Sequence, residues 1–107
     1  MATFKDMEDS LKKFIIQEQS DAHNIKSVNV AKYNNIKIWM DPTKIVEPHI
    51  IIRISISEAI FTLNDFSKIN GGLGYEDRFV NKWFGRFGIK EKLTELWAHA
   101  EKNKEDK

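Results

Sequence analysis

His49 and Arg53 carry the side chains best suited to chemistry, and they lie four residues apart in a run that alternates with isoleucine. An imidazole titrates near neutral pH and can act as a general base. Residues four apart on a β-strand are separated by about 13 Å, so these two side chains do not touch. No carboxylate stands next to His49 on the same face to orient its ring, as a catalytic base requires. We therefore predict that the chain is not an enzyme.

Other kinds of functional site find little support in the sequence. The histidines His23, His49 and His99 fall in separate segments without the spacing of metal ligands. The glycine-rich run 70–74 lacks the lysine of a nucleotide-binding loop, and Glu76 follows it closely. The 17 basic and 16 acidic residues give a net charge of +1, and acids interleave with the C-terminal lysines. We expect no metal, no cofactor and no bound nucleic acid.

The elements that position these residues follow from the hydrophobic pattern. Apolar residues recur at spacings of three and four near the start, with Thr3 as the N-cap, and this predicts a first helix. Alternation then predicts four strands, at 28–33, 36–40, 49–57 and 59–63, with turns at Asn34–Asn35 and Ser57–Glu58. Two amphipathic segments after the glycines predict two more helices, the first carrying Phe79, Val80, Trp83, Phe84 and Phe87, the second Ile89, Leu93, Leu96 and Trp97.

These elements predict an α+β domain, in which a four-stranded antiparallel meander is combined with one N-terminal and two C-terminal helices. The 107 residues, 41% of them hydrophobic and 31% charged, suit one domain over 1–101 with a flexible charged tail at 102–107. There is no cysteine and no apolar run long enough to span a bilayer. The first residues lack a signal-peptide pattern, so we expect a cytosolic protein.

The strand over 49–57 divides its side chains between two faces of the sheet. Ile50, Ile52, Ile54 and Ile56 form an apolar face. The opposite face gathers the candidate binding residues Lys37, Trp39, His49, Ile51, Arg53 and Ile60. Tryptophan and arginine are enriched at binding hot spots, which favours a recognition surface. The alternative is that the N-terminal helix covers this face, with Ile51 and Ile60 packed beneath Phe4, Leu11 and Phe14.

Several stretches between residues 36 and 100 together resemble a small bacterial family of unknown function. The matching stretches are Ile36–Met40, Glu47–Ile52, Glu58–Leu63, Gly72–Gly74, Val80–Trp83 and Leu93–Trp97. Members carry a strand similar to Pro-Pro-His-Phe-His-Val, whose second histidine is replaced here by Ile51. Genes of this family often lie beside toxin–antitoxin-type genes, so the resemblance implies binding to a partner.

We therefore expect a small non-enzymatic domain, bacterial or from a phage, that binds a protein partner as a regulator or inhibitor. The alternative is a domain that binds a small anionic or nucleotide-like ligand, with Trp39 stacking and His49 and Arg53 meeting the negative charge. A third hypothesis is a homo-oligomer, formed through an uncovered strand edge or the apolar stripe Phe79, Trp83 and Phe87.

Overall fold

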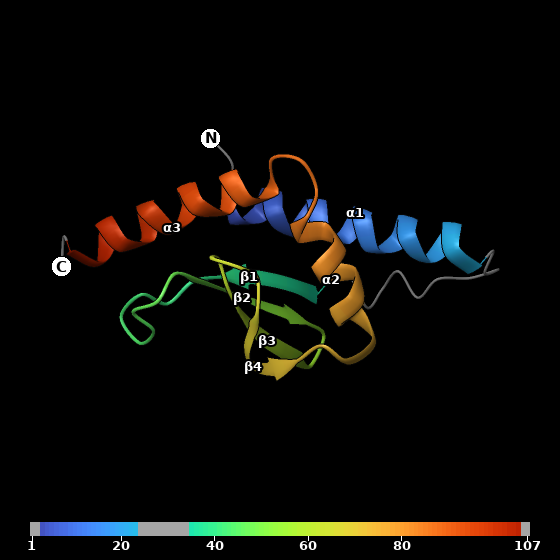
Figure 1. Cartoon of the computed structure of the whole chain (residues 1–107), viewed down its shortest axis with the longest axis horizontal. Coiled ribbons are helices and arrows are strands. Elements are labelled where there is room, and N and C mark those ends of the chain that lie inside the picture. Colours follow the sequence, from blue (N-terminus) through green and yellow to red (C-terminus); the bar gives the residue numbers. More distant parts are fainter. Residues whose placement is uncertain (1–2, 24–34, 106–107) are drawn as a thin grey trace.

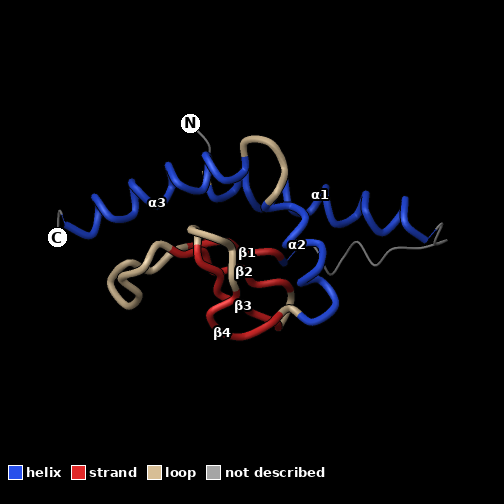
Figure 2. Tube along the Cα trace, viewed as in Figure 1, coloured by secondary structure: helices blue, strands red, loops and turns tan. Residues whose placement is uncertain are grey.

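The computed structural model describes residues 3–23 and 35–105, and its sheet carries three helices on one side (Figures 1 and 2). The strands are β1 (Ile36–Trp39), β2 (His49–Ile54), β3 (Ser57–Thr62) and β4 (Lys68–Gly72). The helices are α1 (Phe4–His23), the 3-10 turn η2 (Gly74–Glu76), α2 (Asp77–Phe84) and α3 (Ile89–Glu105). Neighbouring strands are antiparallel in the order β1-β2-β3-β4. The predicted α+β class and helix arrangement are confirmed.

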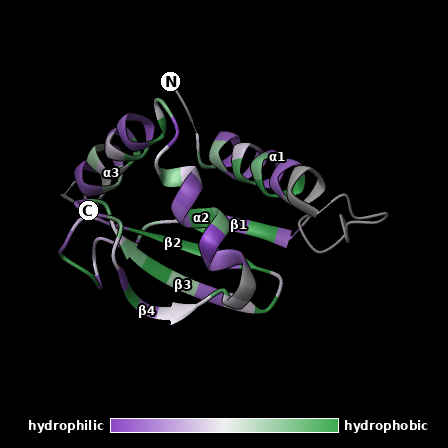
Figure 3. Cartoon of the chain, turned by 45° about the vertical axis from the view of Figure 1, so that its right-hand side comes forward, coloured by the Kyte–Doolittle hydropathy of each residue, from purple (hydrophilic) through white to green (hydrophobic). Residues whose placement is uncertain are grey.

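The core lies between the helices and one face of the sheet. Ile50, Ile52 and Ile54 of β2 are buried in one cluster with Met7 and Leu11 of α1. Much of β1, β2 and β3 has the colour of hydrophobic residues in Figure 3. The same cluster takes in residues of α2 and α3, so all three helices share one core. The expectation that the N-terminal helix covers the opposite face is therefore wrong.

Polar contacts fix the position of α1. Thr3 Oγ1 accepts a hydrogen bond from the Asp6 N–H at 3.1 Å, while the Asp6 carboxylate accepts one from the Thr3 N–H at 3.0 Å. This reciprocal pair caps the first turn, as the predicted N-cap requires. Further along, the Trp83 Nε1–H of α2 donates to Ser10 Oγ at 3.0 Å. The indole therefore keeps a polar partner although Trp83 is fully buried.

The strands differ from the prediction at two places, and a third lies outside the described residues. The fourth strand is β4, which the sequence predicted as a loop because of its glycines. Gly71 has φ +71° and comes so near β3 that a Cβ there would collide with the Glu58 carbonyl oxygen. Gly71 therefore permits close approach of β4 to β3. The predicted strand 28–33 and most of its turn fall outside the described residues.

The turn between β2 and β3 comes two positions earlier than predicted. Ile54 pairs with Ser57, so Ser55 and Ile56 form the turn, and Ser55 has φ +58°. Ile56 is therefore 90% exposed and is not part of the apolar face. Neither turn residue is the glycine or asparagine that usually marks such a turn, which is why the sequence misplaced it. At the other end of the chain, α3 continues to Glu105, past the predicted domain end at 101.

Each edge strand of the sheet carries a feature that disfavours further strand pairing. On β1, the Ile38 N–H donates to Glu8 Oε2 of α1 at 3.0 Å, so a helix side chain occupies that edge. On β4, Asn70 pairs with Ile60 and Lys68 with Phe61, which leaves Ile69 as the extra residue of a bulge. Carboxylates and bulges at edge strands prevent sheets from joining edge to edge.

Asp65 organises the turn between β3 and β4. Its Oδ1 accepts hydrogen bonds from Thr62 Oγ1 at 2.6 Å and from the Ser67 N–H at 3.0 Å. These bonds, that from Thr62 first, lower the pKa of the Asp65 carboxyl to about 2. The turn also places Phe66, at φ +59°, in a stack on Phe84 of α2 with ring centroids 4.2 Å apart. The carboxylate thus fixes a contact between sheet and helix.

We predict that Glu8→Ala lowers the free energy of unfolding by about 1–2 kcal/mol, because the Ile38 N–H loses a charged acceptor. Glu8→Gln keeps a neutral acceptor and should lose less. Urea unfolding followed by circular dichroism measures both. Asp9→Ala is the control, since Asp9 pairs with Lys5 on the surface, where ion pairs contribute little. Equal losses for Glu8→Ala and Asp9→Ala would contradict the proposed edge contact.

Asp65→Asn should lower the melting temperature at neutral pH, because the amide is a weaker acceptor than the carboxylate. The folded pKa of Asp65 is lowered from 3.8 to about 2. The charge therefore stabilises the fold fully above the unfolded pKa, and this stabilisation is lost as the pH falls from 3.8 to about 2. Melting curves of both proteins over this range should converge at the acidic end. A constant difference down to pH 2 would rule out the charged turn.

Candidate functional site

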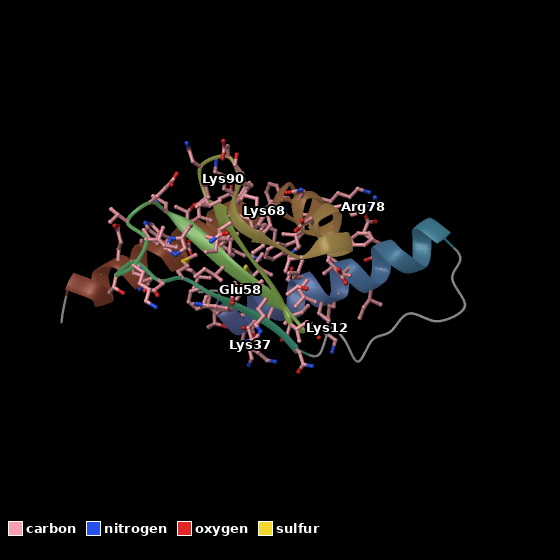
Figure 4. All side chains as sticks on the ribbon, turned by 90° about the horizontal axis from the view of Figure 1, so that it is seen from below. Lys12, Lys37, Glu58, Lys68, Arg78 and Lys90 are labelled. Atoms are coloured by element: carbon pink, nitrogen blue, oxygen red, sulfur yellow. The ribbon has the colours of Figure 1, made fainter. Side chains whose placement is uncertain are left out.

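The sheet has one face that no helix of the described residues covers. Figure 4 looks at the sheet from the side away from α1 and α3, with Lys37 on β1 and Glu58 on β3 labelled. Two cross-strand rows make up this face. One row is Trp39, Ile51 and Ile60, and the other is Lys37, Arg53 and Glu58. We call these six residues the open face.

The first row forms an apolar centre. Trp39 is the Cα partner of Ile51, which in turn pairs with Ile60, so side chains from three strands stand next to one another. Ile51 is only 5% exposed although no helix lies over it. Trp39 and Ile60 are partly exposed and lie outside the main core cluster. The sequence left two positions open for Ile51, a recognition surface or a place beneath the N-terminal helix; the residue is buried, but it does not belong to the core cluster that contains α1.

The second row carries charge and borders the apolar centre. Lys37, Arg53 and Glu58 are all exposed. Arg53 Nε–H donates to the Ser55 carbonyl oxygen at 3.1 Å, which holds the guanidinium over the β2–β3 turn. Next to it is a shallow hollow of about 290 Å³, lined by Asn35, Lys37, Arg53, Ser55 and Ile56. Glu58 was missed as a site residue because the sequence placed the turn there.

His49 does not belong to the open face, contrary to prediction. Its side chain is fully buried, and its ring lies against Trp97 of α3 with centroids 5.1 Å apart. Nε2 accepts a hydrogen bond from the Asp41 N–H at 3.0 Å, and Nδ1 lies 2.8 Å from the Glu47 carbonyl oxygen. Because Nε2 accepts, the proton is on Nδ1 and is donated to Glu47. Both nitrogens are thus engaged in holding the loop between β1 and β2.

The start of that loop is fixed by Asp41. Thr43 Oγ1 donates to its carboxylate at 2.7 Å, and this bond is the main reason that the pKa of Asp41 is lowered. The Asp41 carbonyl oxygen accepts hydrogen bonds from the N–H groups of Lys44 and Ile45. The Asp41–Pro42 pair was predicted to end a strand, and here Asp41 begins a turn whose far end is tied back through His49. These groups hold the loop between β1 and β2.

The structure also places the other segments that the sequence singled out. After β4, the Leu73 N–H donates to Asp77 Oδ1 at 3.0 Å, so a carboxylate occupies the place of an anion. Phe79 and Trp83 are buried, while Phe87 is fully exposed, and the predicted oligomerisation stripe is therefore not continuous. No three metal-ligating acids or histidines converge within residues 3–23 and 35–105. In the same ranges, none of the helices combines the length and apolarity that crossing a bilayer requires.

Comparison with known proteins places this chain in no family. No family model, no curated protein and no solved structure matches it.

We predict that His49→Ala lowers the free energy of unfolding by about 2–4 kcal/mol, because it leaves Asp41 N–H and the Glu47 carbonyl unpaired and opens a space beside Trp97. His49→Phe restores a ring against Trp97 but not the hydrogen bonds, so it should recover only part of the loss. Urea unfolding measures both variants. A His49→Ala protein as stable as the parent would show that the imidazole does not hold this loop.

Proposed function

We propose that this chain is a small non-enzymatic domain that binds a protein partner through the open face. The observation that carries the proposal is the row of Trp39, Ile51 and Ile60, which stands in register on the side of the sheet away from α1 and α3. Tryptophan and arginine are the residues most often found at interaction hot spots. Here Trp39 and Arg53 stand on the two adjacent rows.

The shape of the surface favours a macromolecule over a small metabolite. Small molecules generally bind in deep clefts that enclose most of their surface. The open face has only a shallow hollow at one corner, beside Lys37 and Arg53. An apolar centre bordered by charged side chains is the usual composition of a protein–protein interface.

The two edge strands indicate which surface of the sheet a partner would contact. Glu8 occupies the β1 edge and a bulge at Ile69 distorts the β4 edge. An added strand would therefore find no regular row of free N–H groups. A partner that lies across the open face needs neither edge, and it would bury the apolar row directly.

A role without catalysis is supported by the use of the chain's candidate base. His49 is buried with both ring nitrogens bonded to the loop. The hydrogen bonds of that imidazole go to Asp41 and Glu47 and its ring contact is with Trp97, so the charged open-face groups are not among these partners. As a partner-binding domain the protein would act as a regulator or inhibitor, in line with the resemblance to a family found beside toxin–antitoxin-type genes.

A small anionic ligand is the second candidate function, and the hollow at Lys37 and Arg53 is the observation that favours it. Such a ligand would use Trp39 and Arg53 but not the buried His49. A thermal-shift screen with nucleotides separates the two functions. Stabilisation by a nucleotide that Arg53→Ala abolishes, and that Lys92→Ala on α3 retains, would favour the small ligand.

We predict that Trp39→Ala and Ile60→Asp each weaken partner binding by at least tenfold, since they remove a central anchor or place a charge in the apolar row. The partner is isolated with the full-length parent chain, identified and purified, and its affinity for each variant is measured by calorimetry. Phe87→Asp is the control, because Phe87 is fully exposed in the segment between α2 and α3. Circular dichroism confirms that each variant is folded. Equal weakening by control and test variants would refute the assigned face.

A further inference from the structure

Lys37 and Arg53 form a pair of cations at one corner of the open face, and we infer that the bound partner presents an acidic segment to this pair. The inference rests on the proposed function and specifies the chemistry of the partner. The two residues are Cα partners on β1 and β2, so their side chains leave adjacent strands on the same side of the sheet. Residues so placed have Cα atoms about 5 Å apart.

Neither cation forms an ion pair within the described part of the chain. The ion pairs found there, among them Lys5–Asp9, Lys68–Asp77 and Lys82–Glu18, involve other cations. Two neighbouring like charges repel each other, and an acidic ligand relieves that repulsion. The corner is therefore suited electrostatically to a carboxylate from another molecule.

The position of Arg53 suits a carboxylate in particular. Its Nε–H is used in the bond to the Ser55 carbonyl oxygen, which fixes the plane of the guanidinium. The N–H groups on its two Nη atoms take no part in that bond and can bind the two oxygens of a carboxylate together. The hollow of about 290 Å³ beside it gives an acidic side chain room to reach both cations.

Glu58 makes the charge of this row asymmetric. It is the Cα partner of Arg53 on β3, so the charges across the row run positive, positive and negative. An acidic segment would lie over β1 and β2, and its apolar residues would meet Trp39, Ile51 and Ile60 in the next row. Nucleic acid fits less well, because it needs many clustered cations and would meet the Glu58 carboxylate.

The direct test uses acetylated hexaglutamate peptide and the full-length, isotope-labelled chain in an NMR titration at low salt. We expect amide shifts centred on residues 37 and 53, and we expect them to disappear in 0.5 M salt, where charges are screened. The Lys37→Glu/Arg53→Glu double variant should lose the shifts. The Lys90→Glu/Lys92→Glu variant on α3 makes the same change in net charge and should retain them. Loss in both variants, or in neither, would overturn the inference.

Two further titrations test whether the bound group is a charged peptide or a small anion. Hexaglutamine should produce no shifts at the same positions, and equal shifts from it would exclude charge recognition. Inorganic phosphate should bind more weakly than hexaglutamate. Phosphate binding at the same corner that is as tight as peptide binding would assign the site to small anions and overturn the acidic protein segment.

The purified partner separates failure of this inference from failure of the proposed function. In stopped-flow association at low salt, the Lys37→Glu/Arg53→Glu variant should bind the partner about tenfold more slowly than the parent, and the difference should shrink as salt is added. If partner binding is lost in Ile60→Asp but is unchanged in the double charge variant, the result supports the open face as the binding surface and refutes the acidic segment. Binding that survives Ile60→Asp refutes the proposed face itself.

Discussion

The burial of one face of the sheet beneath all three helices is the constraint on which the other features depend. Successive residues of a strand point to opposite faces of the sheet. When the helices cover one face, the residues between the buried ones therefore lie on the uncovered face. Ile50, Ile52 and Ile54 face the helices, and Ile51 and Arg53 consequently face outward. Antiparallel sheets are stable with one side uncovered. Here the uncovered side carries an apolar row as well as charges, and this combination makes it a candidate for recognition.

Polar side chains in this chain serve the backbone where the regular hydrogen bonding of the sheet ends. Glu8 accepts from the outer edge of β1, His49 ties together the loop between β1 and β2, and Asp65 closes the turn between β3 and β4. Main-chain donors left unpaired in such places are costly. The imidazole and carboxylates that suggest chemistry in the sequence are therefore largely occupied in holding irregular segments. Arg53 differs from them because its bond to the Ser55 carbonyl oxygen uses only Nε–H and leaves both Nη groups out of that bond.

Much of the candidate site follows from the period of two in the sequence. That alternation separated Arg53 and Ile51 from their isoleucine neighbours, and it correctly grouped Lys37, Trp39 and Ile60 with them. The alternation assigned His49 to the wrong environment. His49 is the first residue of β2, and its ring is buried against Trp97 of α3, which the alternation of faces along a strand does not predict. The alternation also missed Glu58. The β2–β3 turn consists of Ser55 and Ile56, and neither is the glycine or asparagine that usually marks such a turn. The glycines of β4 led the sequence to predict a loop in place of a strand. Gly71 is needed there because β4 comes close to β3, and this tertiary contact is not visible in the sequence.

The sequence by itself determined the class of the fold, the helices at each end and the two-sided character of β2, because hydrophobic periodicity is a local property that each segment carries alone. Only the tertiary structure decided that α1 packs on the same side as α2 and α3, that Glu8 blocks the β1 edge, and that His49 is buried against Trp97. These outcomes depend on contacts between residues far apart in the chain. Which face a helix covers is set by the shape and packing of the whole core, and no local pattern contains that information.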